Sequence, residues 1–407
     1  MPINTFVIKA ASRCNLNCSY CYIYNLGDST YKAQPKFMSR ETVDFFILKV
    51  RNYVKEYGLN SIFIVFHGGE PMLWPQQSFV YFVDSISKIL PDVKVTKVIQ
   101  TNGTLLDDDW CRLFRELEIQ ISISIDGPKE FHNEFRKYYN GSSSFGDVMK
   151  GFKVRNQYGE GGMIAVVNPQ ISPSDFYTLV KQTSSKVVTL LLPDENHDTN
   201  ECTDSMYQLG GYAEWMISLY EIWKQDDSSR PRINMFSLII SNIIGGNPYD
   251  DQIGSGDCNA ICIETDGSIE VIDTLRTCKN GFTKNSLNVE FNEINEIETE
   301  PLFELYKGSH NKYLPQVCKA CKINSVCGGG YIIHRFSTAN GFDNPSIYCK
   351  DLMKLIIHIQ NDVIDMLPRE VISREELIKI SISECIPVNT QRSSLHENEF
   401  LRSFSNI

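Results

Sequence analysis

The stretch Ser12-Arg13-Cys14-Asn15-Leu16-Asn17-Cys18-Ser19-Tyr20-Cys21-Tyr22 decides how the rest of the chain is interpreted. Its three cysteines have the spacing C-x3-C-x2-C and directly follow the apolar run Phe6–Ala10, so we expect them on a loop after a strand. Such a loop wraps one corner of a cubane iron–sulfur cluster and leaves the fourth iron without a protein ligand. An open iron of this kind can hold a substrate or a second cofactor and act on it.

Structural zinc is the alternative for these cysteines. Zinc takes four ligands in paired CxxC or Cys/His sets, and no fourth ligand lies close in the sequence. Three thiolates at this spacing therefore favour a 4Fe-4S cluster. Tyr20 and Tyr22 flank the last cysteine, so their rings can shield a bound aromatic ring.

Length, charge and cysteine content limit the function classes. A chain of 407 residues predicts two or three domains, at roughly 150 residues each. The net charge of −11 argues against nucleic acid or an anionic membrane as the main partner. The 13 cysteines are an odd number, gathered mostly towards the two ends, which favours metal ligation in a reducing compartment over a disulfide framework. With no signal-peptide pattern and no membrane-length apolar run, we expect a cytoplasmic enzyme.

The first half of the chain alternates short β-rich runs with longer helical patterns. We expect strands at Thr5–Ala10, Ser61–Phe66, Val93–Gln100, Ile119–Ile125, Met163–Val167 and Val187–Leu192. We expect helices near Arg40–Tyr57, Gln76–Ile89, Asp107–Leu117, Phe145–Gln157, Pro173–Gln182 and Met206–Lys224, the first with Ser39 as its N-cap. Six βα units predict an α/β fold with a parallel sheet, read here as a partial (β/α)6 barrel. Chemistry in such barrels gathers at the carboxyl ends of the strands.

Three further motifs follow predicted strands in turn. They are His67-Gly68-Gly69-Glu70-Pro71, Gln100-Thr101-Asn102-Gly103 and Ser122-Ile123-Ser124-Ile125-Asp126-Gly127-Pro128. Together with the cysteine loop they resemble the radical S-adenosylmethionine (radical SAM) superfamily, and the resemblance covers most of the chain. It implies a SAM-binding 4Fe-4S cluster on Cys14, Cys18 and Cys21.

The resemblance also implies roles for residues in these motifs. The family's matching motif binds the methionyl amino group of SAM, which corresponds here to Gly68, Gly69 and Glu70. Arg136 would pair with the methionyl carboxylate. Further SAM contacts are implied for Tyr20, Asn102, Ser122 and Ser124, the two serines towards the ribose. The alternatives are a plain tight turn at the glycines, small packing residues at the serines and a solvated surface arginine.

A second set of cysteines lies in the C-terminal third. Cys318, Cys321 and Cys327 form C-x2-C-x5-C, and Cys349 supplies a fourth thiolate, enough for a second 4Fe-4S cluster. Four-thiolate zinc fits the spacing nearly as well. The arrangement resembles the SPASM extension of peptide-modifying radical SAM enzymes, which implies an auxiliary cluster on these four residues.

The sequence departs from the SPASM pattern at Tyr331, which replaces a cysteine. Cys258, Cys262 and Cys278 therefore either hold a further cluster with an open or non-cysteine ligand or are buried free thiols. The chain would then carry two clusters, or three.

Long strings in the C-terminal third most resemble the peptide maturases that form three-residue cyclophanes, the FxsB-like and Xye-type enzymes. These strings are Glu264–Ser268, Cys327–Phe336 and Gly341–Cys349. The resemblance implies a ribosomally made precursor peptide, a carbon–carbon crosslink to an aromatic side chain, and an external reductant such as flavodoxin or ferredoxin. Asp343 and His334 are candidates for the base that the reaction needs.

Three alternatives to this function stay open. One is another radical SAM/SPASM modification, such as thioether formation or formylglycine generation. The second is a non-catalytic iron–sulfur electron carrier, and the third is a zinc-stabilised peptide-binding module.

The expected domain organisation has four segments. They are a radical SAM barrel at 1–225, a bridge at 226–257, a SPASM auxiliary-cluster domain at 258–350, and a C-terminal helix and tail at 351–407. Within the last three we expect helices at Met235–Ile244 and Leu352–Met366. We expect no separate leader-peptide-binding winged helix, because the barrel begins within a few residues of Met1.

Overall fold

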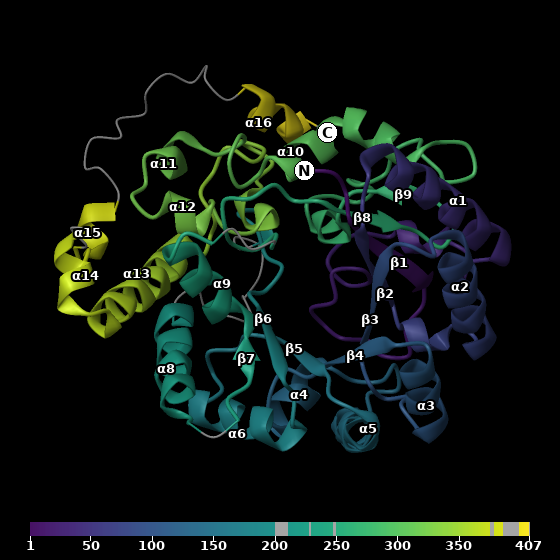
Figure 1. Cartoon of the computed structure of the whole chain (residues 1–407), viewed down its shortest axis with the longest axis horizontal. Helices are drawn as coiled ribbons and strands as arrows, with labels where there is room; N and C mark the ends of the chain where they lie inside the picture. Colours follow the sequence, from purple (N-terminus) through teal and green to yellow (C-terminus); the bar gives the residue numbers. More distant parts are fainter. Residues whose placement is uncertain (200–210, 228, 247–249, 375–377, 386–398, 407) are drawn as a thin grey trace. The chain divides into compact units, whose positions relative to one another are not determined.

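The computed structural model describes residues 1–199, 211–227, 229–246, 250–374, 378–385 and 399–406 (Figure 1). The chain divides into two compact units. The first comprises Met1–Val166, Thr178–Pro193 and Asn259–Glu304, and the second comprises Val167–Tyr177, Asp194–Cys258 and Leu305–Ile407. No helix among the described residues is both long and apolar enough to cross a membrane. The segment boundaries at 225, 257 and 350 stay predictions.

The first unit is built on a sheet with the strand order β6-β5-β4-β3-β2-β1-β8-β9. The strands are β1 (Thr5–Ala11), β2 (Ser61–Gly68), β3 (Lys94–Thr101), β4 (Ile119–Ser124), β5 (Gly162–Val166), β6 (Val187–Leu191), β8 (Ala260–Ile263) and β9 (Ile269–Glu270). Strands β1 to β6 pair in chain order and all in parallel, β8 pairs in parallel with β1, and β9 pairs antiparallel with β8. Pairing in chain order is typical of a (β/α) barrel and differs from a doubly wound sheet.

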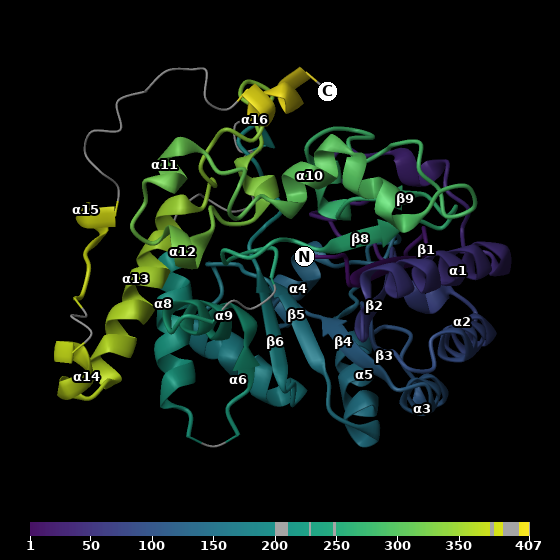
Figure 2. The same cartoon turned by 45° about the horizontal axis from the view of Figure 1, so that its top comes forward.

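Helices follow the strands of this sheet. They are α1 (Arg40–Tyr57), α2 (Gln76–Ile89), α3 (Asp108–Glu116), α4 (Lys129–Phe135) and α5 (Phe145–Tyr158), while α6 (Pro173–Thr183) and α10 (Pro301–Lys307) include residues of both units. Figures 1 and 2 show α1, α2 and α3 along one side of the strands β1 to β4. Short 3-10 helices occur at η1 (Thr30–Lys32), η2 (Pro71–Leu73), η3 (Asp273–Thr277) and η4 (Ile294–Thr299).

The two faces of the sheet differ in polarity, and this difference positions the site. On β2, Ile64 and Phe66 are fully buried, and the Phe66 ring centroid lies 5.0 Å from that of Phe82 in α2. On the alternate positions near the carboxyl ends, Lys9 of β1 stands opposite His67 of β2 in the register. The apolar face therefore packs on the helices, while polar side chains collect on the other face.

The second unit is mostly helical. Its elements are α8 (Tyr212–Gln225), β7 (Arg232–Ile233), α9 (Asn234–Ile243), α11 (Gln316–Lys319), α12 (Asn324–Cys327), η5 (Ile332–Arg335), α13 (Cys349–Met366), α14 (Arg369–Arg374), α15 (Ile382–Cys385), α16 (Glu399–Ser403) and η6 (Phe404–Asn406). Helix α13 is tied to α8, because Asp351 accepts the N–H of Ala213 at 2.9 Å and Asp362 accepts the Tyr220 hydroxyl at 2.7 Å.

Most of the expected elements are confirmed. All six strands form, and the helices at Arg40–Tyr57 and Gln76–Ile89 have the expected bounds. Ser39 caps α1 by accepting the N–H of Thr42 at 3.1 Å. The part of the helix expected at Met206–Lys224 that precedes Gly211 lies outside the described residues. The fold class is confirmed as α/β with a parallel sheet. Helix α4 and the strands β8 and β9 were not expected, because all three are short.

Candidate active site

The cysteine loop between β1 and α1 is anchored to the chain after β4. The N–H groups of Asn17 and Ser19 donate to the carbonyls of Lys137 and Phe135 at 2.8 and 3.0 Å. Within the loop, the N–H of Cys21 donates to the carbonyl of Cys18 at 3.0 Å. The loop is therefore held by backbone hydrogen bonds at the carboxyl end of the sheet.

Neighbouring thiols of this loop contribute to the pKa values of Cys14 and Cys21. Burial raises the pKa of Cys21 to about 11, and Cys18 adds to the rise. Burial also raises the pKa of Cys14, with further contributions from Glu70, Cys18 and Cys21. Neighbouring thiolates of this kind are unfavourable without a cation, and the iron of a cluster would supply the positive charge that stabilises them.

The His67–Pro71 motif packs directly on the start of the loop. The N–H of Gly69 donates to the carbonyl of Ala11 at 2.8 Å, and the N–H of Glu70 donates to that of Arg13 at 2.9 Å. A Cβ on Gly69 would lie 1.9 Å from the Tyr24 hydroxyl oxygen, so no larger residue fits there. The glycine that we expected to approach a ligand thus approaches the cysteine loop itself.

Glu70 joins the end of β2 to the end of β3. Its carboxylate is fully buried and accepts the N–H groups of Met72 and Asn102 at 3.0 and 2.8 Å and the Thr101 hydroxyl at 2.7 Å. Burial raises the pKa of Glu70. The carboxylate of the expected SAM residue is therefore held in a fixed orientation.

Asn102 ties the same strand end to the cysteine loop. Its Nδ2 donates to Asn15 Oδ1 at 2.8 Å, and the Cys14 Sγ lies 3.8 Å away. Asn15 donates in turn to the Thr104 hydroxyl at 2.8 Å. The structure therefore brings Asn102 to the first cysteine of the loop.

Tyr20, Asp126 and Arg136 form a triad beside the cysteines, in which Asp126 and Arg136 are buried. The Tyr20 hydroxyl donates to the Asp126 carboxylate and accepts from Arg136 Nη1 at 2.7 Å. Arg136 is 8% exposed, and its Nε is buried with no hydrogen-bond partner in the described part of the chain. Arg136 is thus not the solvated surface group that the sequence allowed, and it keeps a free donor.

The two serines of β4 lie on its partly exposed face. Ser122 stands opposite Gln100 in the register, and Ser124 accepts from Gln100 Nε2 at 2.9 Å. The alternate residues Ile121 and Ile123 are buried. Both serine side chains therefore lie on the polar side of the sheet.

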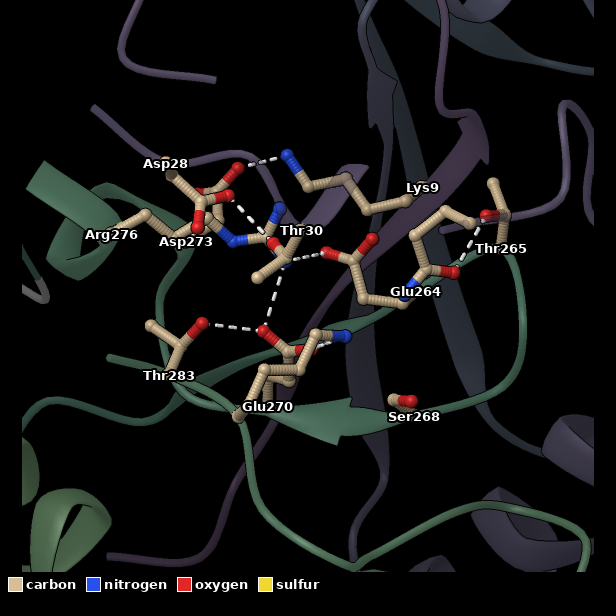
Figure 3. A network of polar contacts seen from close by, with 12 residues as sticks. Lys9, Asp28, Thr30, Glu264, Thr265, Ser268, Glu270, Asp273, Arg276 and Thr283 are labelled. Atoms are coloured by element: carbon tan, nitrogen blue, oxygen red, sulfur yellow. Dashed lines mark hydrogen bonds and ion pairs between the residues drawn. The ribbon is translucent and has the colours of Figure 1, made fainter. Parts of the chain in front are cut away.

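The structure adds a buried group that the sequence did not indicate. Asp273 of η3 is paired with Lys9 and accepts the Tyr22 hydroxyl at 2.7 Å (Figure 3 shows the Lys9 and Asp273 side chains). His67 Nδ1 lies 2.9 Å from Lys9 Nζ. Burial lowers the pKa of His67 to about 3, with Lys9 adding to the fall. The signal available in the sequence was His67 itself, at a strand end before two glycines.

A second ion-pair cluster lies next to it, also visible in Figure 3. Arg276 donates to Glu264 at 2.6 Å and to Glu270 at 2.9 Å, and Thr283 donates to Glu270 at 2.5 Å. These contacts fix η3, and with it Asp273, against β8 and β9.

The four cysteines expected to bind an auxiliary cluster meet in the second unit. Cys318 lies in α11, Cys321 follows it, Cys327 ends α12 and Cys349 begins α13. All four line one cavity, together with the apolar side chains of Val317, Ile323, Pro345 and Met353. Burial raises the pKa of the Cys327 thiol, and Cys318 and Cys349 add to the rise. The sequence grouping is therefore also a spatial grouping.

The three cysteines considered for a further cluster, Cys258, Cys262 and Cys278, are divided between the units. Cys258 belongs to the second unit, where its sulfur lies 3.7 Å from the Ser309 hydroxyl. Cys262 on β8 and Cys278 directly after η3 belong to the first. Burial raises the pKa of Cys262 well above its usual value, and the Asp273 carboxylate adds to this.

The two candidate bases from the sequence lie in the second unit. His334 is buried, with its ring centroid 4.7 Å from that of Tyr348. Asp343 is paired with Arg402 of α16 at 2.8 Å. Both side chains have local partners, and their role as a base stays a prediction.

Comparison with known proteins agrees with this geometry. A model of the radical SAM superfamily matches residues 8–183. A serine-type anaerobic sulfatase-maturating enzyme from Bacteroides thetaiotaomicron is 27% identical over 402 residues, which cover 92% of this chain and 93% of that enzyme. A cysteine-type enzyme of the same kind from Clostridium perfringens is 26% identical and covers 86% and 94%.

A solved structure has the same fold. The structure of native anSMEcpe with bound AdoMet and the Cp18Cys peptide has a TM-score of 0.72 at 22% identity, covering 90% of this chain and 99% of that chain. Strand order, cysteine loop and family match agree on the same part of the sequence. The part of this chain that resembles the radical SAM superfamily, residues 8–183, thus contains the cysteine loop and the strands β2 to β5.

Proposed function

We propose that the chain is a radical SAM maturase of a ribosomally synthesised precursor peptide and that it forms a three-residue cyclophane. The observation that supports this most strongly is that Glu70, through Asn102, and Arg136, through Tyr20, are tied to the loop of Cys14, Cys18 and Cys21 at the carboxyl end of the sheet. The resemblance of the C-terminal strings to cyclophane-forming enzymes supports the finer assignment.

The thiols fit iron–sulfur clusters. Three partly buried thiols lie on the first loop and four line one cavity in the second unit. No three His, Cys, Asp or Glu side chains among the described residues are placed to hold a single metal ion. A cubane cluster is a larger object whose cysteines bind different irons, so it takes a wider set.

The residues around the first cysteines fit SAM as well. The buried Nε of Arg136 is a cationic donor that has no acceptor among the residues the structure describes, and the methionyl carboxylate would supply one. Glu70, which is fully buried, would receive the methionyl ammonium. A cluster held by Cys14, Cys18 and Cys21 would supply the electron, and bound SAM would supply the 5′-deoxyadenosyl radical.

The proposed reaction needs two further groups. Hydrogen is taken from a β-carbon of the peptide, and that carbon then bonds to an aromatic ring two residues earlier. The ring regains aromaticity by losing one proton and one electron, so a base and an acceptor are required. Asp273, beside Tyr22 of the cysteine loop, joins Asp343 and His334 as a candidate base. An auxiliary cluster on Cys318, Cys321, Cys327 and Cys349 would supply the acceptor.

Oxidation of a serine or cysteine to formylglycine is the second candidate. It is favoured by the two relatives, which are named as serine-type and cysteine-type sulfatase-maturating enzymes. An external reductant, such as flavodoxin or ferredoxin, and a cytoplasmic location stay predictions of the sequence in both cases.

Mass spectrometry separates the two candidates. The enzyme is coexpressed with short candidate peptides encoded near its gene, and the product is fragmented. A cyclophane removes two hydrogens, suppresses backbone cleavage between the bonded residues and leaves no aldehyde. A product that reacts with a hydrazide would contradict the cyclophane and favour formylglycine.

A further inference from the structure

Arg335 is a cation buried close to the four cysteines of the second unit. Its side chain is fully buried, within η5 between Cys327 and Cys349 in the sequence. Burying a guanidinium is costly unless other charges or acceptors surround it. The surroundings of Arg335 therefore indicate what its charge is for.

Backbone carbonyls hold the guanidinium in one orientation. Nη1 donates to the carbonyl of Ser309 at 2.9 Å, and Nη2 donates to those of Tyr313 and Phe342 at 2.7 and 3.2 Å. None of these acceptors carries a negative charge. The Nε is buried and has no hydrogen-bond partner among the described residues.

Gly329 gives a common reference point for Arg335 and the cysteines. A Cβ on Gly329 would lie 3.9 Å from Cys318 Sγ and 3.8 Å from Arg335 Nη1. The guanidinium is thus a close neighbour of one sulfur. In agreement, burial raises the pKa of Cys318, and the positive charge of Arg335 acts to lower it.

The other charges near these sulfurs, among the described residues, are paired or exposed. Asp343 lies near enough to raise the pKa of Cys318, but it is paired with Arg402 at 2.8 Å. The lysines that directly follow Cys318, Cys321 and Cys349 are exposed: Lys319, Lys322 and Lys350. Arg335 is therefore the buried charge whose field on the cysteine cavity is least screened by solvent.

We propose that Arg335 raises the reduction potential of the auxiliary cluster and so makes it a better electron acceptor. This inference rests on the proposed function, in which the cluster takes one electron from the aromatic ring while a base takes the proton. Reduction adds one negative charge to the site. A fixed positive charge in a dry environment stabilises the reduced form more than the oxidised one.

The test is a redox titration of the reconstituted full-length protein, followed by electron paramagnetic resonance. All variants carry Cys14, Cys18 and Cys21 as alanine, so a cluster on the first loop contributes no signal. In Arg335→Gln we expect the ratio of reduced to oxidised cluster at a fixed potential to fall at least tenfold, which is about 59 mV for one electron. In Arg335→Lys, which keeps the charge, we expect a fall of less than about threefold.

Two further variants change a charge near the cysteines without altering Arg335. Asp343→Asn removes a negative charge near Cys318, so the same ratio should rise. Lys350→Gln makes the charge change of Arg335→Gln at an exposed position beside Cys349, and should change the ratio by less than about threefold.

The outcomes are distinguishable from failure of the proposed function. A fully loaded Arg335→Gln protein with an unchanged ratio overturns the role of Arg335. If that variant loses its cluster, Arg335→Met, which keeps much of the side-chain volume without the charge, is titrated in its place, and an unchanged ratio there overturns the role of Arg335. A parent protein with no iron and no signal overturns the auxiliary cluster itself, and the inference with it.

Discussion

Arg136 Nη1 donates to the Tyr20 hydroxyl at 2.7 Å, which links residues 116 positions apart in the sequence. Tyr20 lies between Cys18 and Cys21, so this bond joins the cysteine loop to the end of α4. Asp126 completes the triad and also accepts the N–H of Val166 at 3.1 Å. One buried cation thus fixes the loop and keeps its Nε available.

Replacement of Arg136 should weaken SAM binding. For Arg136→Gln we expect at least a tenfold rise in the Kd for SAM, because a charged hydrogen bond contributes about 1.5–3 kcal/mol. Calorimetry under anaerobic conditions measures this. Arg112→Gln, whose side chain is 52% exposed, is the matched control and should leave the Kd unchanged. Unaltered SAM binding in an Arg136→Gln protein with a full cluster would exclude the proposed contact.

The buried ion pair of Lys9 and Asp273 should contribute strongly to the free energy of unfolding. Both residues are buried, and Lys9→Met would leave a buried carboxylate without its cation. We expect the free energy of unfolding to fall by about 3–5 kcal/mol. Denaturant titration measures this change. Adding Asp273→Asn should recover most of the loss, since the uncompensated charge is then gone.

A surface pair provides the control for Lys9. Lys49 lies 2.7 Å from Glu293, whose side chain is 43% exposed. For Lys49→Met we expect a loss of about 0–1 kcal/mol. Equal losses of unfolding free energy in Lys9→Met and Lys49→Met would show that burial does not increase the contribution of the first pair to stability.

His132 should make the protein less stable at mildly acidic pH. Burial, with a smaller effect of Arg136, lowers the pKa of His132 from 6.5 to about 3. Below about pH 6.5 the unfolded chain binds a proton here that the folded chain does not, so stability falls as the pH falls. The loss is about 1.4 kcal/mol per pH unit.

The variant His132→Gln tests this dependence. Gln cannot titrate and can still reach the Ser144 hydroxyl, which lies 2.9 Å from the histidine Nε2. Urea unfolding between about pH 7 and pH 5 should show a shallower dependence in the variant. If stability depended on pH in the same way in the two proteins, His132 would have the same pKa in the folded and in the unfolded chain.

Iron content should identify which cysteines bind clusters. We expect Cys327→Ala to lose about four iron atoms per chain, one cubane cluster. Cys111→Ala, a buried thiol of α3, is the control and should lose none. We expect Cys262→Ala to lose none either, because its sulfur lies among the charges of Lys9, Asp273 and Glu264. A loss of about four irons in Cys262→Ala would establish a third cluster. Zinc in place of iron and sulfide would favour the zinc-stabilised module.

The strands of the sheet could be predicted from the sequence because they carry strong local signals. Thr5–Ala11 and Ser61–Gly68 are bounded by turns and rich in β-branched and aromatic residues, so six strands were predicted within two residues of their ends. β8 has only four residues, and its pairing with β1 is a contact between distant parts of the chain. No local pattern encodes such a pairing.

The candidate site was predicted in part for the same reason. The cysteine loop and the His67–Pro71 motif are contiguous, so their residues could be named from spacing. Asp273 and Lys9 are 264 positions apart, and nothing near either residue indicates the other. The burial of Arg335 likewise depends on carbonyls of Ser309 and Tyr313, which tertiary packing brings to it.

The central claim is that the loop of Cys14, Cys18 and Cys21 supports SAM cleavage. The most direct measurement is 5′-deoxyadenosine formed by the anaerobically reconstituted protein with SAM and a reductant, with iron and sulfide determined on the same sample. We expect deoxyadenosine from the parent protein and none from the variant with all three cysteines replaced by alanine. Iron and sulfide without any deoxyadenosine, even with candidate peptides present, would contradict the claim and favour an electron carrier.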